Sequence, residues 1–338
     1  MRAVRAAFCT AKETIDVRET DDPRPGPGEV LVRVRQCGIC GTDLHWYHGQ
    51  LPPTPAALGH EFSGEIAELG EGVERFAVGN RVAIEPIKAC QACEYCRSGR
   101  RHLCRHRILI GAYYAGGLAD YVTVPEYTLY KLPDGIDFEL GALAEPLAVS
   151  VHGVHLAGTS PGQRVLVLGS GTIGLFAVFA ARHFGATEVI ATYRHEHQGK
   201  AAVAMGATRI VQDGDADGIE KRSADVVVET IGRNAPTLTQ ALGLVRNGGS
   251  ISVLGLFMQP VQIDALSLMR NEITVVGGMT YCRPGLQADF EVALAMLAAD
   301  PDRARKIITH RYPLADAAQA FAIAADKKSG SLKVHIQI

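Results

Sequence analysis

The sequence has 338 residues, more than one hydrophobic core usually supports, so we expect two domains. Its 34 basic and 36 acidic residues leave a net charge of −2, which favours neither nucleic acid nor a membrane surface as a partner. No run of about 18 apolar residues occurs, and the first ten residues lack a long apolar segment, so we expect a cytoplasmic chain without a transmembrane helix. In that compartment, eight cysteines suggest metal binding rather than disulfides.

The first 150 residues predict mostly short strands. Residues 30–35 alternate between valine and other side chains, which places the valines on one face of a strand. A similar pattern covers 61–68, and 81–85 forms a further short strand. Frequent glycines between these segments indicate a small barrel-like or irregular β-domain, with functional residues on the connecting loops.

A motif between the first two of these strands carries metal-binding side chains. Cys40, His60 and Glu61 offer a thiolate, an imidazole and a carboxylate. Three such ligands suit a catalytic zinc ion that keeps one coordination position open for water or substrate. The alternative is a buried thiol beside an ordinary surface His–Glu pair.

Four further cysteines follow in a close series. They are Cys90, Cys93, Cys96 and Cys104. This spacing predicts a closed Cys₄ zinc site that stabilises a polar loop, with two disulfides as the rival interpretation. The lobe also carries five arginines, which leave a nucleic-acid-binding module as an alternative to a solvated rim: Arg97, Arg100, Arg101, Arg105 and Arg107.

A helix is predicted over residues 141–155, with Pro146 in its first turn. Glu145 lies in an apolar context immediately before Pro146. Its carboxylate could cap the helix, or it could be a fourth or exchangeable zinc ligand, which is the interpretation we favour.

The second domain begins with a pattern typical of dinucleotide binding. A buried strand at 164–168 leads into the GxGxxG segment 169–174, a helix to residue 184 and a strand at 188–192. In this context the glycines allow close approach to a pyrophosphate at the helix N-terminus. The alternative is a glycine-rich turn without a ligand. The predicted contacts are Gly169, Gly171, Thr172, Ile173 and Gly174.

The end of the second strand of this unit bears on the cofactor's ribose. NAD-binding proteins usually carry Asp or Glu there, whereas this chain has Tyr193, Arg194 and His195. Arg194, together with His195, could pair with a 2′-phosphate, so we expect NADP to be preferred over NAD. The alternatives are that Arg194 is a solvated loop residue and that Glu196 repels the phosphate.

Strands and helices continue to alternate, which predicts a doubly wound parallel sheet. The expected strands lie at 224–229, 250–256 and 273–276, and the expected helices at 235–245, 289–297 and 314–325. Val253, Leu254 and Gly255 end a strand and should lie near the cofactor. The final residues, 330–338, alternate like a strand that returns to the first domain.

Over essentially its whole length, the sequence resembles the zinc-dependent medium-chain dehydrogenase/reductase (zinc-containing alcohol dehydrogenase) family. The resemblance rests on residues 38–45 and 59–61, the four-cysteine series and the loop 169–174. It implies an α/β fold with two zinc ions per subunit. The implied parts are a GroES-like catalytic domain over 1–149 and 283–338, a structural zinc lobe at about 88–107 and a Rossmann domain over 150–282.

The segment starting at Glu145 resembles the polyol (sorbitol), butanediol and threonine dehydrogenase branch. The horse-liver-type branch has a cysteine at that position, so the resemblance shifts the expected substrate toward secondary alcohols and polyols. It implies hydride transfer between such an alcohol, or its ketone, and NADP(H) or NAD(H), with the proton leaving through Thr42 and the cofactor ribose toward His45. It also suggests a homodimer or homotetramer, with the strand at 273–276 as a candidate interface. The alternatives are an NAD-dependent amino-alcohol or threonine dehydrogenase and a noncatalytic zinc and nucleotide-binding protein.

Overall fold

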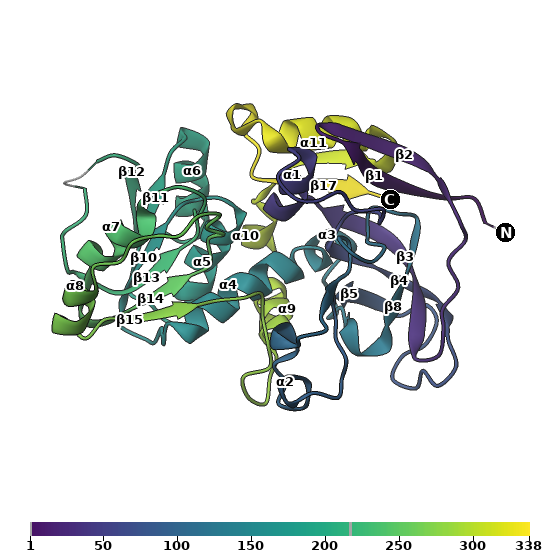
Figure 1. The fold of residues 1–338 in the computed structure, drawn as a ribbon, viewed down its shortest axis with the longest axis horizontal. Coiled ribbons are helices and arrows are strands. Elements are labelled where there is room, and N and C mark those ends of the chain that lie inside the picture. Colours follow the sequence, from purple (N-terminus) through teal and green to yellow (C-terminus); the bar gives the residue numbers. More distant parts are fainter. Residues whose placement is uncertain (1, 216–217) are drawn as a thin grey trace. The chain divides into compact units, whose positions relative to one another are not determined.

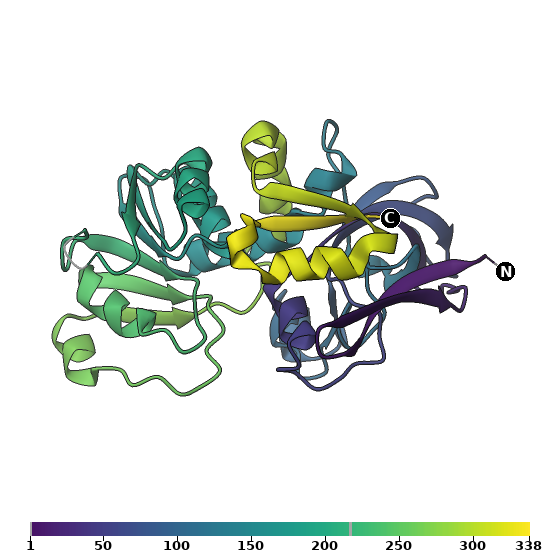
Figure 2. The ribbon, with the colours of Figure 1, turned by 90° about the horizontal axis from the view of Figure 1, so that it is seen from above.

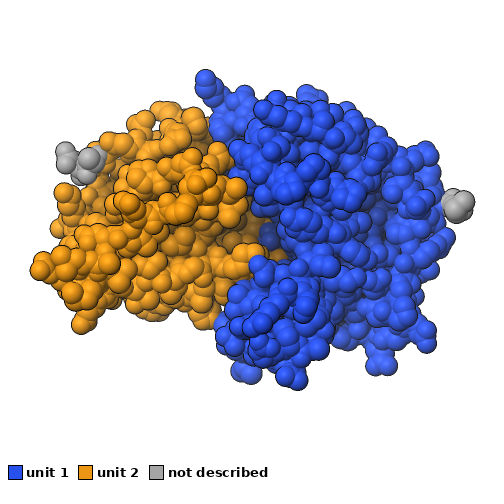
Figure 3. Space-filling model, in the orientation of Figure 1, with its two compact units in different colours: residues 1–145, 282–301, 308–338 blue, residues 146–281, 302–307 orange. Residues whose placement is uncertain are grey.

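The computed structural model describes residues 2–215 and 218–338 and divides the chain into two compact units (Figures 1 and 3). Unit 1 comprises residues 1–145, 282–301 and 308–338, and unit 2 comprises 146–281 and 302–307. The boundaries therefore fall a few residues before those expected, and the short segment 302–307 groups with unit 2. Among the described residues, none of the helices has both the length and the apolar character needed to cross a membrane.

Unit 1 is built on a seven-stranded sheet. Its order is β16 (Ile308–Pro313), β17 (Lys333–Gln337), β3 (Glu29–Gly38), β4 (Glu61–Leu69), β5 (Arg81–Ile84) and β9 (Leu129–Lys131), with β8 (Tyr121–Pro125) also paired to β3. Val30, Val32 and Val34 are buried in its core, as their alternation predicts. Two small antiparallel pairs accompany this sheet: β1 (Val4–Ala11) with β2 (Thr14–Thr20), and β6 (Ile87–Lys88) with β7 (Ile108–Leu109).

The C-terminal strand returns to the first part of the chain, as predicted. β17 pairs antiparallel with β3, where His335 lies opposite Gly38, and parallel with β16. Helix α11 (Ala317–Ala325) runs beside these strands and buries Phe321 in the core of unit 1 (Figure 2). It begins three residues later than predicted because Leu314–Asp316 forms a 3₁₀ turn.

The helices that bear on unit 1 are mostly short. They are α1 (Gly41–Tyr47), α2 (Glu94–Arg97), α3 (Phe138–Gly141), α4 (Ala144–Leu156), which continues into unit 2, and α9 (Asp289–Ala299). The sequence pattern did not predict α1, whose seven residues are too few to show a helical period. A capping interaction starts it, since Asp43 accepts a hydrogen bond from the Cys40 amide at 2.8 Å.

Unit 2 is a six-stranded parallel sheet flanked by helices. Its strand order is β12 (Arg209–Gln212), β11 (Glu188–Tyr193), β10 (Arg164–Leu168), β13 (Ala224–Glu229), β14 (Val245–Val253) and β15 (Thr274–Gly277). Its helices are α5 (Thr172–His183), α6 (Glu196–Met205), α7 (Thr237–Leu244), α8 (Ala265–Arg270) and α10 (Pro301–Arg305). This order is that of the Rossmann fold. The strands predicted at 164–168 and 224–229 have the expected bounds.

The remaining predicted elements of unit 2 differ in their limits. The strand expected at 250–256 runs from Val245 to Val253; its pairing with β13 shifts register between Val245 and Ser250, where Gly248 has a φ of +69°. Helix α6 and strand β12 were not predicted. Strand β12 is short and only one of its four residues is buried, so it lacks a clear apolar signal.

Candidate functional site

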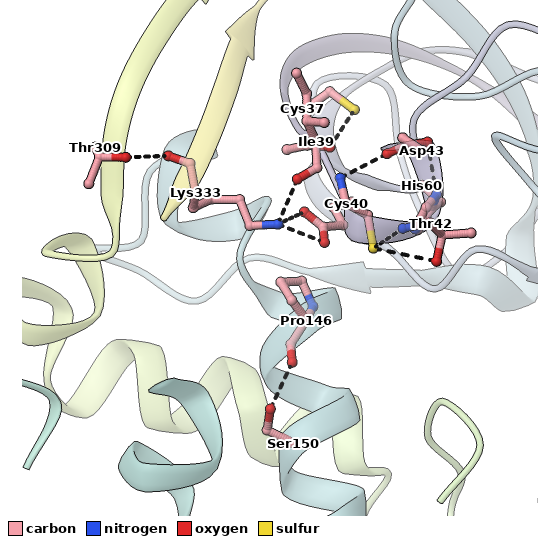
Figure 4. A network of polar contacts seen from close by, with 12 residues as sticks. Cys37, Ile39, Cys40, Thr42, Asp43, His60, Pro146, Ser150, Thr309 and Lys333 are labelled. Carbon is pink, nitrogen blue, oxygen red and sulfur yellow. Dashed lines mark hydrogen bonds and ion pairs between the residues drawn. The ribbon is translucent and has the colours of Figure 1, made fainter. Parts of the chain in front are cut away.

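Three side chains with metal-binding atoms converge in unit 1 (Figure 4). The ligand atoms of Cys40, His60 and Glu61 all lie within 4.8 Å of one another, and His60 and Glu61 are buried. Cys40 is the N-cap of α1, while Glu61 is the first residue of β4. Gly59 precedes His60 in a backbone conformation with φ +96°, which glycine adopts without strain. A side chain at this position would also collide with the Cys37 sulfur, at 2.6 Å. The combination of a thiolate, an imidazole and a carboxylate fits zinc.

Asp43 contacts both the Cys40 backbone and the His60 imidazole. One of its oxygens accepts from the Cys40 amide, and the other lies 3.5 Å from His60 Nδ1. Burial lowers the pKa of His60, but the charges of Asp43 and Cys40 outweigh this effect and raise it well above the ordinary value. Because Asp43 faces Nδ1, the other ring nitrogen is left to bind a metal. Sequence analysis missed this fully buried carboxylate.

Lys333 is a second residue that the sequence did not reveal. Its ammonium lies 2.8 and 2.5 Å from the two oxygens of Glu61 and donates to the Ile39 carbonyl at 3.0 Å (Figure 4). Burial lowers the pKa of Lys333, but attraction to Glu61 and further charges, including Glu145, raises it above its usual value. The ammonium therefore stays charged and engages both oxygens of the Glu61 carboxylate.

The other candidate catalytic residues lie on two helices. Glu145 is buried in the first turn of α4, outside the three residues whose ligand atoms converge, and its charge acts on Lys333. Thr42 and His45 lie on α1, with the Thr42 hydroxyl 3.7 Å from the Cys40 sulfur. His45 Nδ1 lies 2.5 Å from Gln50 Oε1. Since the amide oxygen accepts, this contact places the ring's proton on Nδ1.

The four-cysteine series forms a compact cluster in unit 1. The Sγ–Sγ distances are 3.8 Å for Cys90–Cys96, 3.5 Å for Cys93–Cys96 and 3.6 Å for Cys104–Cys90. A tetrahedron with zinc–sulfur bonds of about 2.3 Å has edges of about 3.8 Å, so these sulfurs fit zinc. A disulfide needs about 2.05 Å, so the rival interpretation is wrong for this structure, where all four cysteines are free.

The protonation of these thiols differs within the cluster. Backbone amides of Ala92 and Cys93 donate toward Cys90 and lower its pKa to about 6. Burial and the neighbouring thiols raise the pKa of Cys96 to about 12. A metal ion binding here would therefore have to displace a proton from Cys96.

In unit 2, the loop after β10 is shaped for close approach of a ligand backbone. Gly169 has φ +99°, and a side chain at Gly174 would lie 1.9 Å from the Gly169 carbonyl oxygen. Gly171, the N-cap of α5, has open space where a side chain would stand. The Gly169 amide donates to the Thr192 hydroxyl at 2.9 Å, and the Ser170 hydroxyl donates to the Thr192 carbonyl at 2.7 Å. This cradle at a helix N-terminus fits a dinucleotide pyrophosphate.

Other predicted cofactor residues surround the ends of the parallel strands. The amides of Leu254 and Gly255 donate to the Glu229 carbonyl at 2.8 and 3.1 Å. The buried Glu229 side chain in turn accepts from the amides of Ile231 and Gly232 at 2.8 and 2.9 Å. Glu229 therefore fixes two neighbouring loops at the carboxyl edge of the sheet.

Arg194 is exposed at the end of β11 and pairs with Asp213. Its Nη2 and Nε lie 2.9 and 3.2 Å from the same Asp213 oxygen. His195 is the N-cap of α6, and the amides of Arg194 and His195 both donate to Gln198 Oε1. Asp213 also borders a cavity of about 370 Å³. Sequence analysis missed Asp213 because it follows the unpredicted strand β12.

Comparison with known proteins agrees with these features. A family model described as an alcohol dehydrogenase GroES-like domain matches residues 26–134, and one described as a zinc-binding dehydrogenase matches residues 172–299. The chain is 36% identical over 329 residues to a sorbitol dehydrogenase from Halalkalibacterium halodurans, with 94% of each chain covered. It is 34% identical over 327 residues to an L-threonine 3-dehydrogenase from Deinococcus deserti, with 93% of each covered.

A solved structure extends the likeness to three dimensions. The crystal structure of a zinc-binding dehydrogenase from Sinorhizobium meliloti 1021, bound to NADP, matches with a TM-score of 0.90 and 34% identity over 100% of both chains. The β-rich unit is thus GroES-like, and the parallel sheet is the nucleotide-binding part of the fold. The chain belongs to the zinc-dependent medium-chain dehydrogenase/reductase family and is an NAD(P)-dependent alcohol oxidoreductase.

Proposed function

We propose that this enzyme interconverts a secondary alcohol or polyol and its ketone, using NADP(H) in preference to NAD(H). The observation that carries this proposal is the cluster of the half-buried Cys40 with the buried His60 and Glu61, whose donor set suits a zinc site that is open to substrate. Its similarity to a sorbitol dehydrogenase, together with Glu145 at the branch-specific position, supports the polyol class.

Two zinc ions per subunit would be held by different ligand sets. Cys40 and His60 would bind the catalytic ion, with a carboxylate from Glu61 or Glu145. Because Lys333 holds both oxygens of Glu61, Glu145 would bind to and leave the catalytic ion more easily than Glu61 would. The four cysteines of the 88–107 lobe would bind the structural ion. When bound, zinc would supply a Lewis acid for the substrate oxygen and the nicotinamide would supply the hydride acceptor.

The chain's own residues would move the proton. Thr42 and His45 are three positions apart on α1, so their side chains share one face of the helix. With the His45 proton on Nδ1 and directed at Gln50, Nε2 is left as the proton-accepting nitrogen. Thr42 would receive the substrate proton, and His45 would pass it to solvent.

The preference for NADP rests on Arg194. A guanidinium offers several donors in a fork that matches phosphate oxygens, and this residue stands where NAD-binding proteins usually carry an acid. A relative of similar fold was crystallised with NADP. The assembly would be a homodimer or homotetramer acting on a small-molecule substrate.

The decisive experiment measures initial rates on secondary alcohols, diols, polyols and threonine, each with NADP⁺ and NAD⁺, together with zinc content. We expect the enzyme to oxidise one of these alcohol classes, and to do so faster with NADP⁺ than with NAD⁺. Cys40→Ser should lose the catalytic zinc and activity, while Cys9→Ser should retain both. Zinc-loaded protein that is inactive on the whole panel would contradict the proposed substrate class.

A second candidate is an NAD-dependent amino-alcohol or threonine dehydrogenase. The similarity to an L-threonine 3-dehydrogenase, at 34% identity, favours it specifically. It requires turnover of threonine and a preference for NAD⁺, so the same substrate panel separates the two candidates.

A further inference from the structure

The ion pair between Arg194 and Asp213 joins the ends of two neighbouring strands in unit 2. Arg194 follows β11, and Asp213 follows β12. Two guanidinium nitrogens converge on one Asp213 oxygen, at 2.9 and 3.2 Å. The chain thus lacks an acid directly after β11 but receives one from the adjacent strand.

The backbone holds Asp213 in this place independently of the ion pair. Tyr193 and Gln212 are register partners in the β11–β12 pairing. The Asp213 amide also donates to the Tyr193 carbonyl at 2.7 Å. A change in the Asp213 side chain therefore alters the charge beside Arg194 while these main-chain contacts remain.

Asp213 also lines a cavity in unit 2. The 370 Å³ cavity that it borders is lined by Leu168, Thr192 and Ile231, which come from the ends of β10 and β11 and from the loop after β13. In an open α/β sheet, this carboxyl edge is where nucleotides bind. Arg194 would attract a ribose 2′-phosphate, whereas the adjacent carboxylate repels it and can accept a hydrogen bond from a 2′-hydroxyl.

We propose that Asp213 is a specificity-determining residue that limits the NADP preference given by Arg194 and so lets the site also accept NAD. This inference rests on the proposed role of Arg194 in binding the 2′-phosphate. The carboxylate neutralises part of the guanidinium's charge and engages two of its donors. The acid that the sequence lacks after β11 is thus supplied from β12.

The test compares binding of 2′,5′-ADP and 5′-AMP, and of NADP⁺ and NAD⁺, to the full-length zinc-loaded protein by calorimetry. Asp213→Asn keeps an oxygen acceptor for Arg194 but removes the negative charge. The affinity ratio favouring the 2′-phosphorylated ligand should rise about five- to tenfold, the scale expected when one partly screened charge near a phosphate is removed. An unchanged or lower ratio would overturn the role of Asp213.

Asp215→Asn is the matched control. Asp215 borders the same cavity, but its carboxylate lies beside Gly218, where a side chain would approach it to 2.6 Å. Its substitution should leave the affinity ratio unchanged. An equal rise in both variants would show only a general effect of charge and would count against the inference.

Arg194→Gln separates this inference from the function proposed above. This substitution should lower the affinity ratio that favours the 2′-phosphorylated ligand. An unchanged ratio would show that neither Arg194 nor Asp213 takes part in recognising the 2′-phosphate. A response to Arg194→Gln without one to Asp213→Asn would reject the role of Asp213 alone. Because the readout is nucleotide binding, an inactive substrate panel would overturn the proposed substrate class without affecting this result.

Discussion

At the scale of single residues, the partners of the candidate zinc ligands determine how those ligands are held. Asp43 faces Nδ1 of His60, so Nε2 is left as the ring nitrogen that could bind a metal. Lys333 balances the charge of Glu61. A buried carboxylate without such a partner is strongly destabilising. The geometry around Cys40 therefore depends on residues that bind no metal themselves.

Lys333→Met should destabilise unit 1 because it leaves the Glu61 carboxylate buried without its cation. We expect a loss of about 3–5 kcal/mol in the free energy of unfolding, measured by urea denaturation of the zinc-loaded protein. Adding Glu61→Gln should restore part of that loss, because it removes the unbalanced charge. Lys200→Met, at an exposed position on α6, is the control. A loss for Lys333→Met as small as the control's would contradict this account.

The residues of the candidate metal site could be picked out from the sequence, but the side chains that hold them in place could not. Cys40 and the neighbouring His60–Glu61 pair lie in short motifs whose residue types indicate zinc. Lys333 is separated from Glu61 by 272 positions, and only the pairing of β17 with β3 brings them together. By contrast, the role of Asp43 could have been predicted from the sequence, because an acidic residue three positions after an N-cap is a recognisable helix-start signal.

At the scale of elements, the four-cysteine lobe has little apolar content and depends on its proposed metal. Cys93→Ser should bind one zinc fewer per chain and leave the loop poorly ordered. Trypsin should then cut among its arginines, within residues 97–107, and metal analysis with mass spectrometry would detect both changes. Cys9→Ser, which alters a cysteine of β1 outside the cluster, should keep its zinc and resist trypsin. Full zinc content in Cys93→Ser would refute the Cys₄ assignment.

Strand β17 carries a buried histidine that should make the fold sensitive to acid. Both ring nitrogens of His335 lack hydrogen-bond partners among the described residues. Burial, with help from Lys333 and Arg311, lowers its pKa to about 3. The unfolded chain binds a proton near pH 6.5 and the folded chain does not, so stability present above pH 6.5 is lost as the pH falls toward about 3.

His335→Leu should therefore reduce the dependence of stability on pH. Between pH 6 and 4, the wild-type free energy of unfolding should fall up to about 1.4 kcal/mol per pH unit more steeply than that of the variant. Urea denaturation at a series of pH values measures both slopes. His310→Gln, on the adjacent strand β16, should keep the wild-type slope. Identical slopes for wild type and His335→Leu would exclude this source of acid sensitivity.

At the scale of the whole molecule, the order of elements was more predictable than their ends. Residues 164–168 form a strand in the centre of the parallel sheet, with four buried apolar residues after Arg164, and both its type and its limits were correct. Residues 209–212 form an edge strand with one buried side chain, so periodicity alone could not find them. The proposed role of Asp213, which follows that strand, could emerge only from the folded chain.

The parallel sheet of unit 2 ends at β15 on the edge opposite β12, and this edge is a candidate interface between copies of the chain. β15 has one neighbouring strand in unit 2, and the adjacent helix α8 leaves Leu266 and Met269 about half exposed, at 52% and 63%. A strand edge with free main-chain donors and acceptors beside exposed apolar side chains favours pairing with a second copy of the chain. This edge contains the strand at 273–276 that the family resemblance suggests as a candidate interface.

Substituting both Leu266 and Met269 by glutamate should convert the proposed oligomer into smaller species, down to the 36.1 kDa chain if β15 forms the only contact. Two carboxylates on each facing surface would repel one another and would have to lose their hydration on association. Sedimentation velocity over a range of protein concentrations would measure the change. Val203→Glu, an equally exposed apolar position on α6, should leave the mass unchanged. Retention of the wild-type mass by the double variant would place the interface elsewhere on the molecule.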